Sequence, residues 1–157
     1  MKKFELTAES KINIFGKKLF RIKALISFGD VEEGETGGWI EKEENLEQSS
    51  GDAWVYGNAE VYGDAEVYGN ARVSGDARVS GDADYTTIHG FGTQFRTTTF
   101  FQCEDKQIRV SCGCFLGTIP EFREQVKNTR EGKIAEEYLM IADLMEKHFV
   151  KEKESGE

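Results

Sequence analysis

Proline, histidine and cysteine are scarce in this chain of 157 residues, which has one proline, two histidines and three cysteines. The odd number of cysteines argues against a disulfide framework and favours reduced thiols. Long apolar runs are absent, and the first six residues carry two lysines and a glutamate where a signal peptide needs an unbroken apolar stretch. We therefore expect a cytoplasmic protein without a membrane span.

Positive charge is also in the minority, because 29 acidic residues face 20 basic ones and the formal net charge is −9. The charges are spread along the whole chain, so the sequence indicates no basic footprint for bulk nucleic acid. The hydrophobic content of 38% is low for a domain of this length. We expect the chain to rely on self-association.

Glycine, by contrast, is abundant, with 17 residues, and it recurs at a fixed spacing. Residues 53–82 are five consecutive hexads of the form Ala-x-Val-x-Gly-Asn/Asp, and residues 83–88 form a degenerate sixth. A low-complexity linker would not keep valine and alanine in phase. We expect each hexad to supply one short strand, with valine and alanine inside and glycine with Asn/Asp at the corner. The inward valines are Val55, Val61, Val67, Val73 and Val79.

Three hexads would close one coil of eighteen residues, which predicts the neighbours of successive coils. Glu60 should lie over Arg78, and Trp54 over Arg72. The first pair would be an ion pair and the second a cation–π contact, each worth about 0.5 kcal/mol at the surface. We interpret both as devices that fix the register.

The flanking segments should cap the open ends of the repeats. On the N-terminal side we expect strands at residues 4–6, 12–15 and 19–26. On the C-terminal side, residues 95–103 and 107–112 should form a β-hairpin. Thr118 and Glu121 should then form the capping box of a helix that reaches Thr129, and a second helix should span 133–149. The chain is thus divided into an N-terminal β cap (1–50), the repeats (51–88), a hairpin with two helices (89–150) and a frayed tail (151–157).

The repeats resemble those of the hexapeptide-repeat family, whose members form left-handed parallel β-helices and are usually homotrimers. The segment Gly37-Gly-Trp-Ile40 and the start of the repeats resemble uncharacterised bacterial and prophage proteins, and Val110-Ser-Cys-Gly-Cys-Phe115 with Gly117-Thr118 resembles a C-terminal module of short phage proteins. The resemblance implies a mainly β fold: a short left-handed parallel β-helix capped by N-terminal strands, followed by a β-hairpin and two C-terminal α-helices. It also suggests a phage protein that acts in the cytoplasm of the bacterial host against its defences.

Acyl transfer is the commonest activity of the hexapeptide-repeat family, and it requires a histidine base and a long groove. This chain has only His89 and His148, neither within a regular hexad, and its roughly two coils span only about 10 Å. We therefore predict that the protein is not an enzyme and has no cofactor. Acyl transfer with His89 as the base stays as an alternative.

A metal site is a further alternative, because Cys112 and Cys114 with Cys103 and His89 would provide four ligands. The spacing does not fit a zinc knuckle, and buried thiols that act as small apolar side chains explain the cysteines better. The Asn and Asp residues of the repeats follow a six-residue period, whereas calcium-binding β-rolls use nine. We predict no metal.

The junction between the hairpin and the first helix, residues 111–121, is a candidate anion site, because a glycine turn that leads into a helix exposes backbone N–H groups. It lacks the lysine of a P-loop, but the polar run 89–99 could bring an arginine and hydroxyl groups beside it. The alternative is that the threonines are ordinary strand residues and Arg96 is a surface charge. The candidate ligand-binding residues are His89, Arg96, Thr97, Thr98, Thr99, Ser111, Gly113, Cys114, Phe115 and Thr118.

These observations favour a non-catalytic homo-oligomer, a trimer by family resemblance, that sequesters a small anionic, nucleotide-like ligand in pockets between subunits. Trp39, Phe91 or Phe115 could stack on a base. A second hypothesis is an inhibitor that binds a host protein through aromatic residues on one face of the repeats, which could instead mediate subunit packing. These residues are Trp54, Tyr56, Tyr62 and Tyr68.

Overall fold

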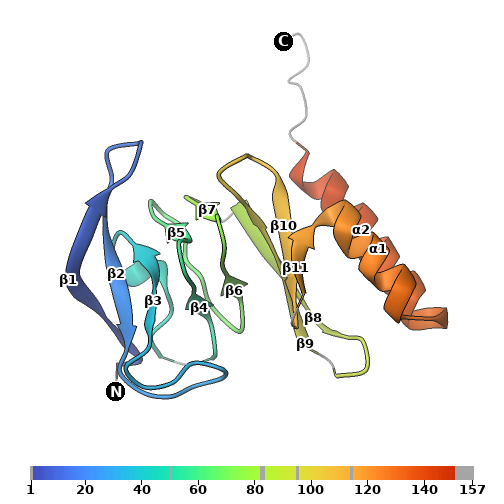
Figure 1. The fold of residues 1–157 in the computed structure, drawn as a ribbon, viewed down its shortest axis with the longest axis horizontal. Coiled ribbons are helices and arrows are strands. Elements are labelled where there is room, and N and C mark those ends of the chain that lie inside the picture. Colours follow the sequence, from blue (N-terminus) through green and yellow to red (C-terminus); the bar gives the residue numbers. More distant parts are fainter. Residues whose placement is uncertain (1, 50, 82–83, 95, 114, 151–157) are drawn as a thin grey trace, which may run out of the picture.

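The computed structural model describes residues 2–49, 51–81, 84–94, 96–113 and 115–150. Its parts follow one another in sequence order along the long axis of the molecule (Figure 1). The N-terminal strands lie at one end, the repeats in the middle, and a second sheet with two helices at the other end. The repeats are therefore covered at both ends by other parts of the chain.

The N-terminal strands are β1 (Phe4–Ile12), β2 (Lys18–Ala24) and β3 (Thr36–Ile40), joined in antiparallel pairs. The strand expected at 12–15 is wrong, because this segment is the turn of the β1–β2 hairpin. There the Asn13 side-chain carbonyl accepts hydrogen bonds from the backbone N–H groups of Phe15 and Lys17. A short 3₁₀ turn, η1 (Glu43–Asn45), then leads into the repeats.

The repeats form four two-residue strands: β4 (Trp54–Val55), β5 (Glu60–Val61), β6 (Arg72–Val73) and β7 (Arg78–Val79). Parallel pairing places Trp54 beside Arg72 and Glu60 beside Arg78, so the predicted eighteen-residue spacing is confirmed. The inward direction of the repeat valines and alanines is also confirmed, since all ten of these side chains are fully buried. The corner glycines Gly57 and Gly63 have φ of 58° and 64°, a backbone conformation that favours glycine.

The predicted fold class, a left-handed parallel β-helix, is nevertheless wrong. The strands form a five-stranded mixed sheet in the order β1-β2-β3-β5-β7, a two-stranded parallel sheet β4-β6, and a separate four-stranded antiparallel sheet. Five hexads bury too little surface to stand alone, and two of their short strands, β5 and β7, extend the N-terminal sheet instead. The backbone N–H of Trp39, for example, donates to the Ala59 carbonyl at 3.0 Å, which joins β3 to the repeats.

The second sheet contains β8 (Tyr85–Phe91), β9 (Arg96–Gln102), β10 (Ile108–Cys112) and β11 (Phe115–Thr118) in the order β11-β10-β9-β8. The predicted hairpin is confirmed as the antiparallel pair β9–β10. The sequence did not reveal β8 and β11, and β8 takes residues 85–88 out of the expected repeat region. These residues do not keep the Val-x-Gly pattern of a hexad, and instead pair antiparallel with β9.

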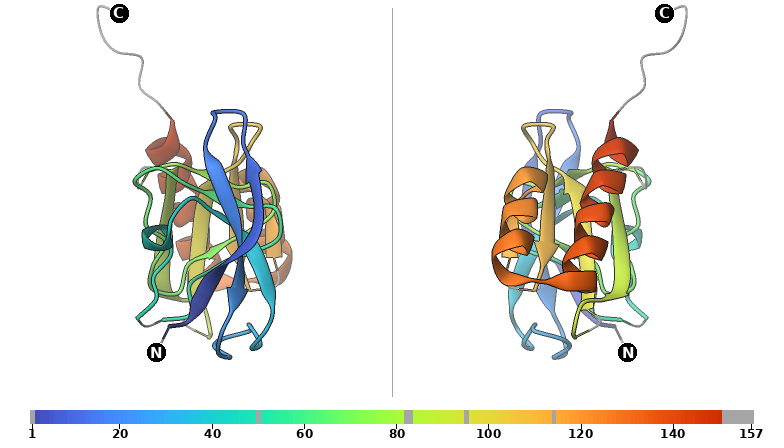
Figure 2. Two further views of the ribbon diagram at one scale, coloured as in Figure 1. Left: turned by 90° about the vertical axis from the view of Figure 1, so that its left-hand side faces the viewer. Right: turned by 90° about the vertical axis from the view of Figure 1, so that its right-hand side faces the viewer.

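Helices α1 (Ile119–Thr129) and α2 (Gly132–Phe149) lie side by side on the outer face of this sheet (Figure 2). The predicted capping box is confirmed, because the Thr118 hydroxyl accepts from Glu121 N–H while the Glu121 carboxylate accepts from Thr118 N–H. Within the described ranges, neither helix has the length and apolar character needed to cross a membrane. Alternate residues of β9 face opposite sides: Phe101 packs toward the repeats and Phe100 toward the helices.

Candidate functional site

A cleft lies where the repeats meet the second sheet, and we call it the arginine cleft. It consists of two adjoining hollows of about 290 and 430 Å³ that share Asp30, Tyr56, Arg72, Arg96 and Gly113. The first hollow is completed by polar residues that include His89, Gln94 and Thr97, and the second by residues that include Ser111, Phe115 and Leu116. One side of the cleft is therefore polar, and the other is partly apolar.

Arg72 reaches the cleft from β6, in the repeats. Its guanidinium pairs with the Asp30 carboxylate at 3.0 Å and lies 5.3 Å from the centre of the Tyr56 ring. The expected cation–π contact with Trp54 is thus replaced by one with Tyr56. Burial raises the pKa of Tyr56 above its ordinary value. The ring offers a flat face beside a positive charge.

Arg96 reaches the same cleft from the first position of β9, opposite Phe91 of β8. Its guanidinium lies against the backbone of Gly113, in the space where a β-carbon of that residue would stand, and Gly113 has a φ of +59°. None of the ion pairs in the described part of the chain involves Arg96. Arg96 can therefore bind an anion without first breaking an ion pair with a carboxylate.

His89 and Thr97 are cross-strand partners on β8 and β9, and both line the polar hollow. Nδ1 of His89 lies 2.8 Å from the Thr97 hydroxyl oxygen. This contact orients the ring and leaves the other ring nitrogen free to meet a ligand. Together with the two arginines, the pair gives the cleft donors from three strands.

Three of the predicted ligand-binding residues, Thr98, Thr99 and Thr118, do not line the cleft. Thr98 is buried and donates to Cys112 Sγ at 3.2 Å, and the buried Thr99 hydroxyl accepts from Arg72 N–H at 3.1 Å. Thr118 caps α1, and Cys114 lies outside the described residues. The structure thus gathers His89, Arg96, Thr97, Ser111, Gly113 and Phe115 of that prediction in the two hollows.

Arg72, Asp30 and Tyr56 were not predicted as ligand-binding residues. Arg72 and Tyr56 occupy the variable positions of the hexad, where the repeat pattern carries no information about function. Asp30 comes from the loop between β2 and β3, far away in sequence. The signal in the sequence was the change at these two positions from Trp or Glu with Tyr in the first three hexads to Arg with Ser in the last two.

The four aromatic residues predicted to contact a host protein do not form one exposed strip. Trp54 is fully buried and meets Phe4 and Phe28 edge to face, at centroid distances of 6.3 and 5.3 Å. Tyr62 is buried beside Phe15 of the hairpin turn. Tyr56 lines the arginine cleft, and Tyr68, 60% exposed, is the one large exposed member of the set. The N-terminal strands, which cover the repeats, explain this burial.

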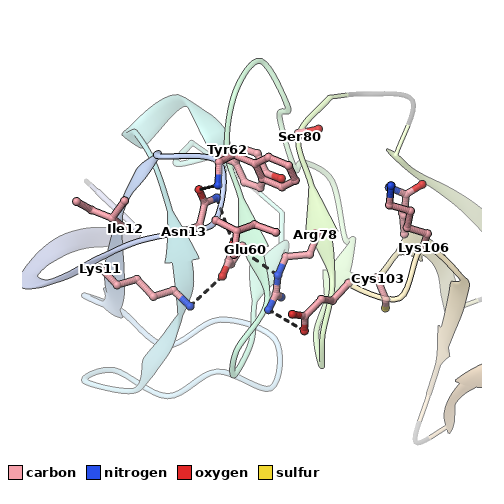
Figure 3. A pocket seen from close by; sticks show the side chains of 13 residues that line it. Lys11, Ile12, Asn13, Glu60, Tyr62, Arg78, Ser80, Cys103 and Lys106 are labelled. Atoms are coloured by element: carbon pink, nitrogen blue, oxygen red, sulfur yellow. Dashed lines mark hydrogen bonds and ion pairs between the residues drawn. The ribbon is translucent and has the colours of Figure 1, made fainter.

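A second cavity of about 400 Å³ lies between the β1–β2 turn, the repeats and the β9–β10 turn (Figure 3). The buried Glu60 carboxylate at its wall pairs with Lys11 at 2.9 Å and with Arg78 at 3.5 Å, and Arg78 also pairs with Glu104 at 3.5 Å. These cations are already neutralised by carboxylates. We interpret the cluster as a clamp that joins the three parts of the molecule.

The described cysteines are separated by the second sheet. Cys103 belongs to the core beneath the repeats, whereas Cys112 packs against the core beneath the helices. Burial raises the pKa of the Cys103 thiol to about 11, so it is protonated and inert at neutral pH. No group of three or more potential metal ligands occurs among the residues that the structure describes.

Comparison of the chain with protein-family models and with curated proteins found no match.

Proposed function

We propose that this protein is a non-catalytic binding protein that captures a small anionic, nucleotide-like ligand in the arginine cleft. The observation that carries the proposal is the convergence of Arg72 and Arg96 on one cleft from two different sheets. Arginine binds phosphate through paired N–H donors, and an arginine without a carboxylate partner is predisposed to do so. Asp30 and Asp52 line the same hollow as the two arginines, so the cleft has no net positive charge, and what favours an anion is the absence of an ion-pair partner for Arg96 among the described residues.

The walls of the cleft favour an organic phosphate over inorganic phosphate. Tyr56 and Phe115 both line the second hollow and provide aromatic surface suited to stacking on a base. Gln94, His89 and Thr97 offer hydrogen bonds to a sugar or a base edge. The two hollows together fall in the roughly 300–1,000 Å³ range of small-molecule sites.

Capture, rather than turnover, is the proposed activity, and the resemblance to phage proteins supports a role against the bacterial host, such as sequestering a nucleotide-derived signal. The cleft is built by one chain, so the proposal no longer requires a pocket between subunits. His89 would act as a hydrogen-bond donor to the ligand. It would not act as a catalytic base.

The test begins with native mass spectrometry of the protein purified from a bacterial host, followed by denaturation to release any bound mass. Isothermal titration calorimetry with 5′-AMP, 5′-GMP, a cyclic dinucleotide and inorganic phosphate then gives the affinities. We expect Arg96→Gln to weaken binding of the preferred nucleotide about tenfold or more, since a hydrogen bond to a charged group contributes about 1.5–3 kcal/mol.

The matched control is Lys127→Gln, which removes one positive charge from an exposed position on α1, away from the cleft. It should bind as the wild type does. Equal affinities for Arg96→Gln and the wild type, or no binding of any anion and no released mass, would contradict the proposal.

A further inference from the structure

Helix α2 presents an apolar pair to the outside of the molecule. Its inner face is formed by Tyr138, Ile141, Ala142 and Met145, all buried against the sheet and α1. On the opposite face, Met140 is 70% exposed and Leu144 is 57% exposed. These two residues are one helical turn apart, so their side chains are adjacent. Figure 2 shows α2 at the surface of the end formed by the helices.

Two carboxylates and two basic residues flank this apolar pair, with the exposed Lys133 about one turn further toward the N-terminus. Glu136 and Glu137 precede the pair, and Lys147 and His148 follow it. No ion pair in the described part of the chain involves any of these four side chains. Asp143 and Glu146, by contrast, point toward α1 and are both bound by Arg123, at 2.9 and 3.0 Å. The outward-facing Glu136, Glu137 and Lys147 thus have no ion-pair partner within the part of the chain that the structure describes.

We propose that α2 packs antiparallel on α2 of a second copy of this chain, related by a two-fold axis at the height of residue 142. In that arrangement two residues lie level with each other when one precedes position 142 and the other, in the partner, follows it by the same number of residues. Met140 then meets Leu144 of the partner subunit, and the apolar pair is covered at the centre of the contact.

The same axis matches the charges. At 100° per residue, Glu136 and Lys147 lie on one flank of the apolar pair, and Glu137 and His148 on the other. The residues level with each other lie on opposite flanks, so on each flank the nearest partners are offset by one residue, about 1.5 Å along the axis. The two-fold axis therefore brings Glu136 beside Lys147 of the partner subunit and Glu137 beside His148 of the partner subunit. Because each contact occurs twice, four pairs of a carboxylate with a basic group surround the apolar centre. A parallel arrangement would instead place glutamate beside glutamate.

The predicted dimer is weak. An 18-residue helix is about 27 Å long, and its outer face covers less than the roughly 800 Å² per partner of a standard interface. We expect a dissociation constant in the micromolar range or above, so that dimers dominate only in concentrated solution. The arginine cleft lies on the opposite side of the second sheet, so the two proposals can fail independently.

Sedimentation velocity of the full chain over a range of concentrations tests the interface. We expect the average mass to rise from that of one chain toward that of two as concentration increases. Leu144→Glu should stay monomeric and keep the wild-type circular dichroism spectrum, because the side chain is already exposed. The control is Ile14→Glu, which introduces the same charge at an 87% exposed apolar residue of the β1–β2 turn and should still dimerise.

A charge exchange tests the antiparallel register. Glu136→Lys alone places lysine beside lysine, and Lys147→Glu alone places glutamate beside glutamate, so each variant should dimerise at least several-fold more weakly than the wild type. An equimolar mixture of the two variants should form mixed dimers. In a mixed dimer one chain has lysine at both positions and the other has glutamate at both, so each contact pairs a lysine with a glutamate. The proposal would be overturned if the wild type stayed monomeric at high concentration or if Leu144→Glu dimerised as strongly as the wild type. It would also be overturned if the mixture of the two charge variants dimerised no more strongly than each variant alone.

Discussion

The guanidinium of Arg96 occupies the place where a side chain on Gly113 would begin, so the glycine holds open the position from which the arginine faces the cleft. Replacement of Gly113 by alanine would have to push Arg96 aside. It would also place a β-carbon on a backbone with a φ of +59°, a conformation unfavourable for other residues by roughly 1 kcal/mol.

We predict that Gly113→Ala lowers the affinity for the captured nucleotide to the same extent as Arg96→Gln. Gly57→Ala is the matched control, because Gly57 has a φ of +58° and nothing lies within 4 Å of the place where its β-carbon would stand, so this variant carries the backbone strain alone. Calorimetry on both variants separates displacement of the arginine from strain. Equal affinities for the two glycine variants would contradict the prediction.

Asp30 should limit the affinity of the cleft, because its carboxylate pairs with Arg72 and carries the same sign as the ligand. The aspartate side chain is 70% exposed, so solvent screens much of this interaction. We predict that Asp30→Asn binds the same nucleotide a few-fold more tightly, as measured by calorimetry at low salt. Weaker binding would indicate that Asp30 positions Arg72 for the ligand.

The clamp around Glu60 should contribute to stability. Glu60→Gln leaves Arg78 and Lys11 without their shared carboxylate, but Arg78 keeps Glu104 and Lys11 is partly exposed. We therefore expect a loss of about 1–3 kcal/mol in the free energy of unfolding, below the value for a fully buried pair. Urea denaturation provides the measurement. Lys2→Ala, which breaks the exposed pair with Glu43, should change stability by less than about 0.5 kcal/mol.

The capping box should make the stability of α1 depend on pH. Hydrogen bonds from the backbone and side chain of Thr118 lower the pKa of Glu121 below its ordinary value of 4.5. A carboxyl group with a depressed pKa in the folded state stabilises the protein above its unfolded-state pKa, and this contribution is lost as the pH falls through the folded-state pKa.

We accordingly predict that Glu121→Ala lowers the thermal midpoint at neutral pH. The difference in thermal midpoint between this variant and the wild type should become smaller at a pH well below the ordinary glutamate pKa. The effect should be modest, since the carboxyl group is exposed. Glu124→Ala, at an exposed position on the same helix, is the control and should lack this pH-dependent difference. An equal difference in thermal midpoint at neutral pH and in acid would show that ionisation of Glu121 does not contribute to stability.

Cys103 should resist alkylation in the folded protein. Burial both shields the thiol and raises its pKa to about 11, so the reactive thiolate is scarce at neutral pH. We expect peptide mapping after iodoacetamide treatment to find Cys103 unmodified in the native protein and modified in urea. Modification of Cys103 in native protein at the rate seen in urea would show that this core opens readily.

The sequence by itself determined the elements whose rules are local. The hexad period placed Trp54 beside Arg72 and Glu60 beside Arg78, because an eighteen-residue return is set by repeating corner geometry. The Thr118 capping box and the β9–β10 hairpin were equally readable, since their hydrogen bonds join residues close in the chain.

Only the tertiary structure decided how these elements combine. Whether the short repeat strands stack as an independent helix or complete another sheet depends on which free edges meet, and here β3 meets β5. That meeting brings the N-terminal strands over Trp54 and buries it. The arginine cleft has the same origin. Asp30, Arg72 and Arg96 come from three separate parts of the chain, and no local pattern relates residues that are joined only by long-range packing.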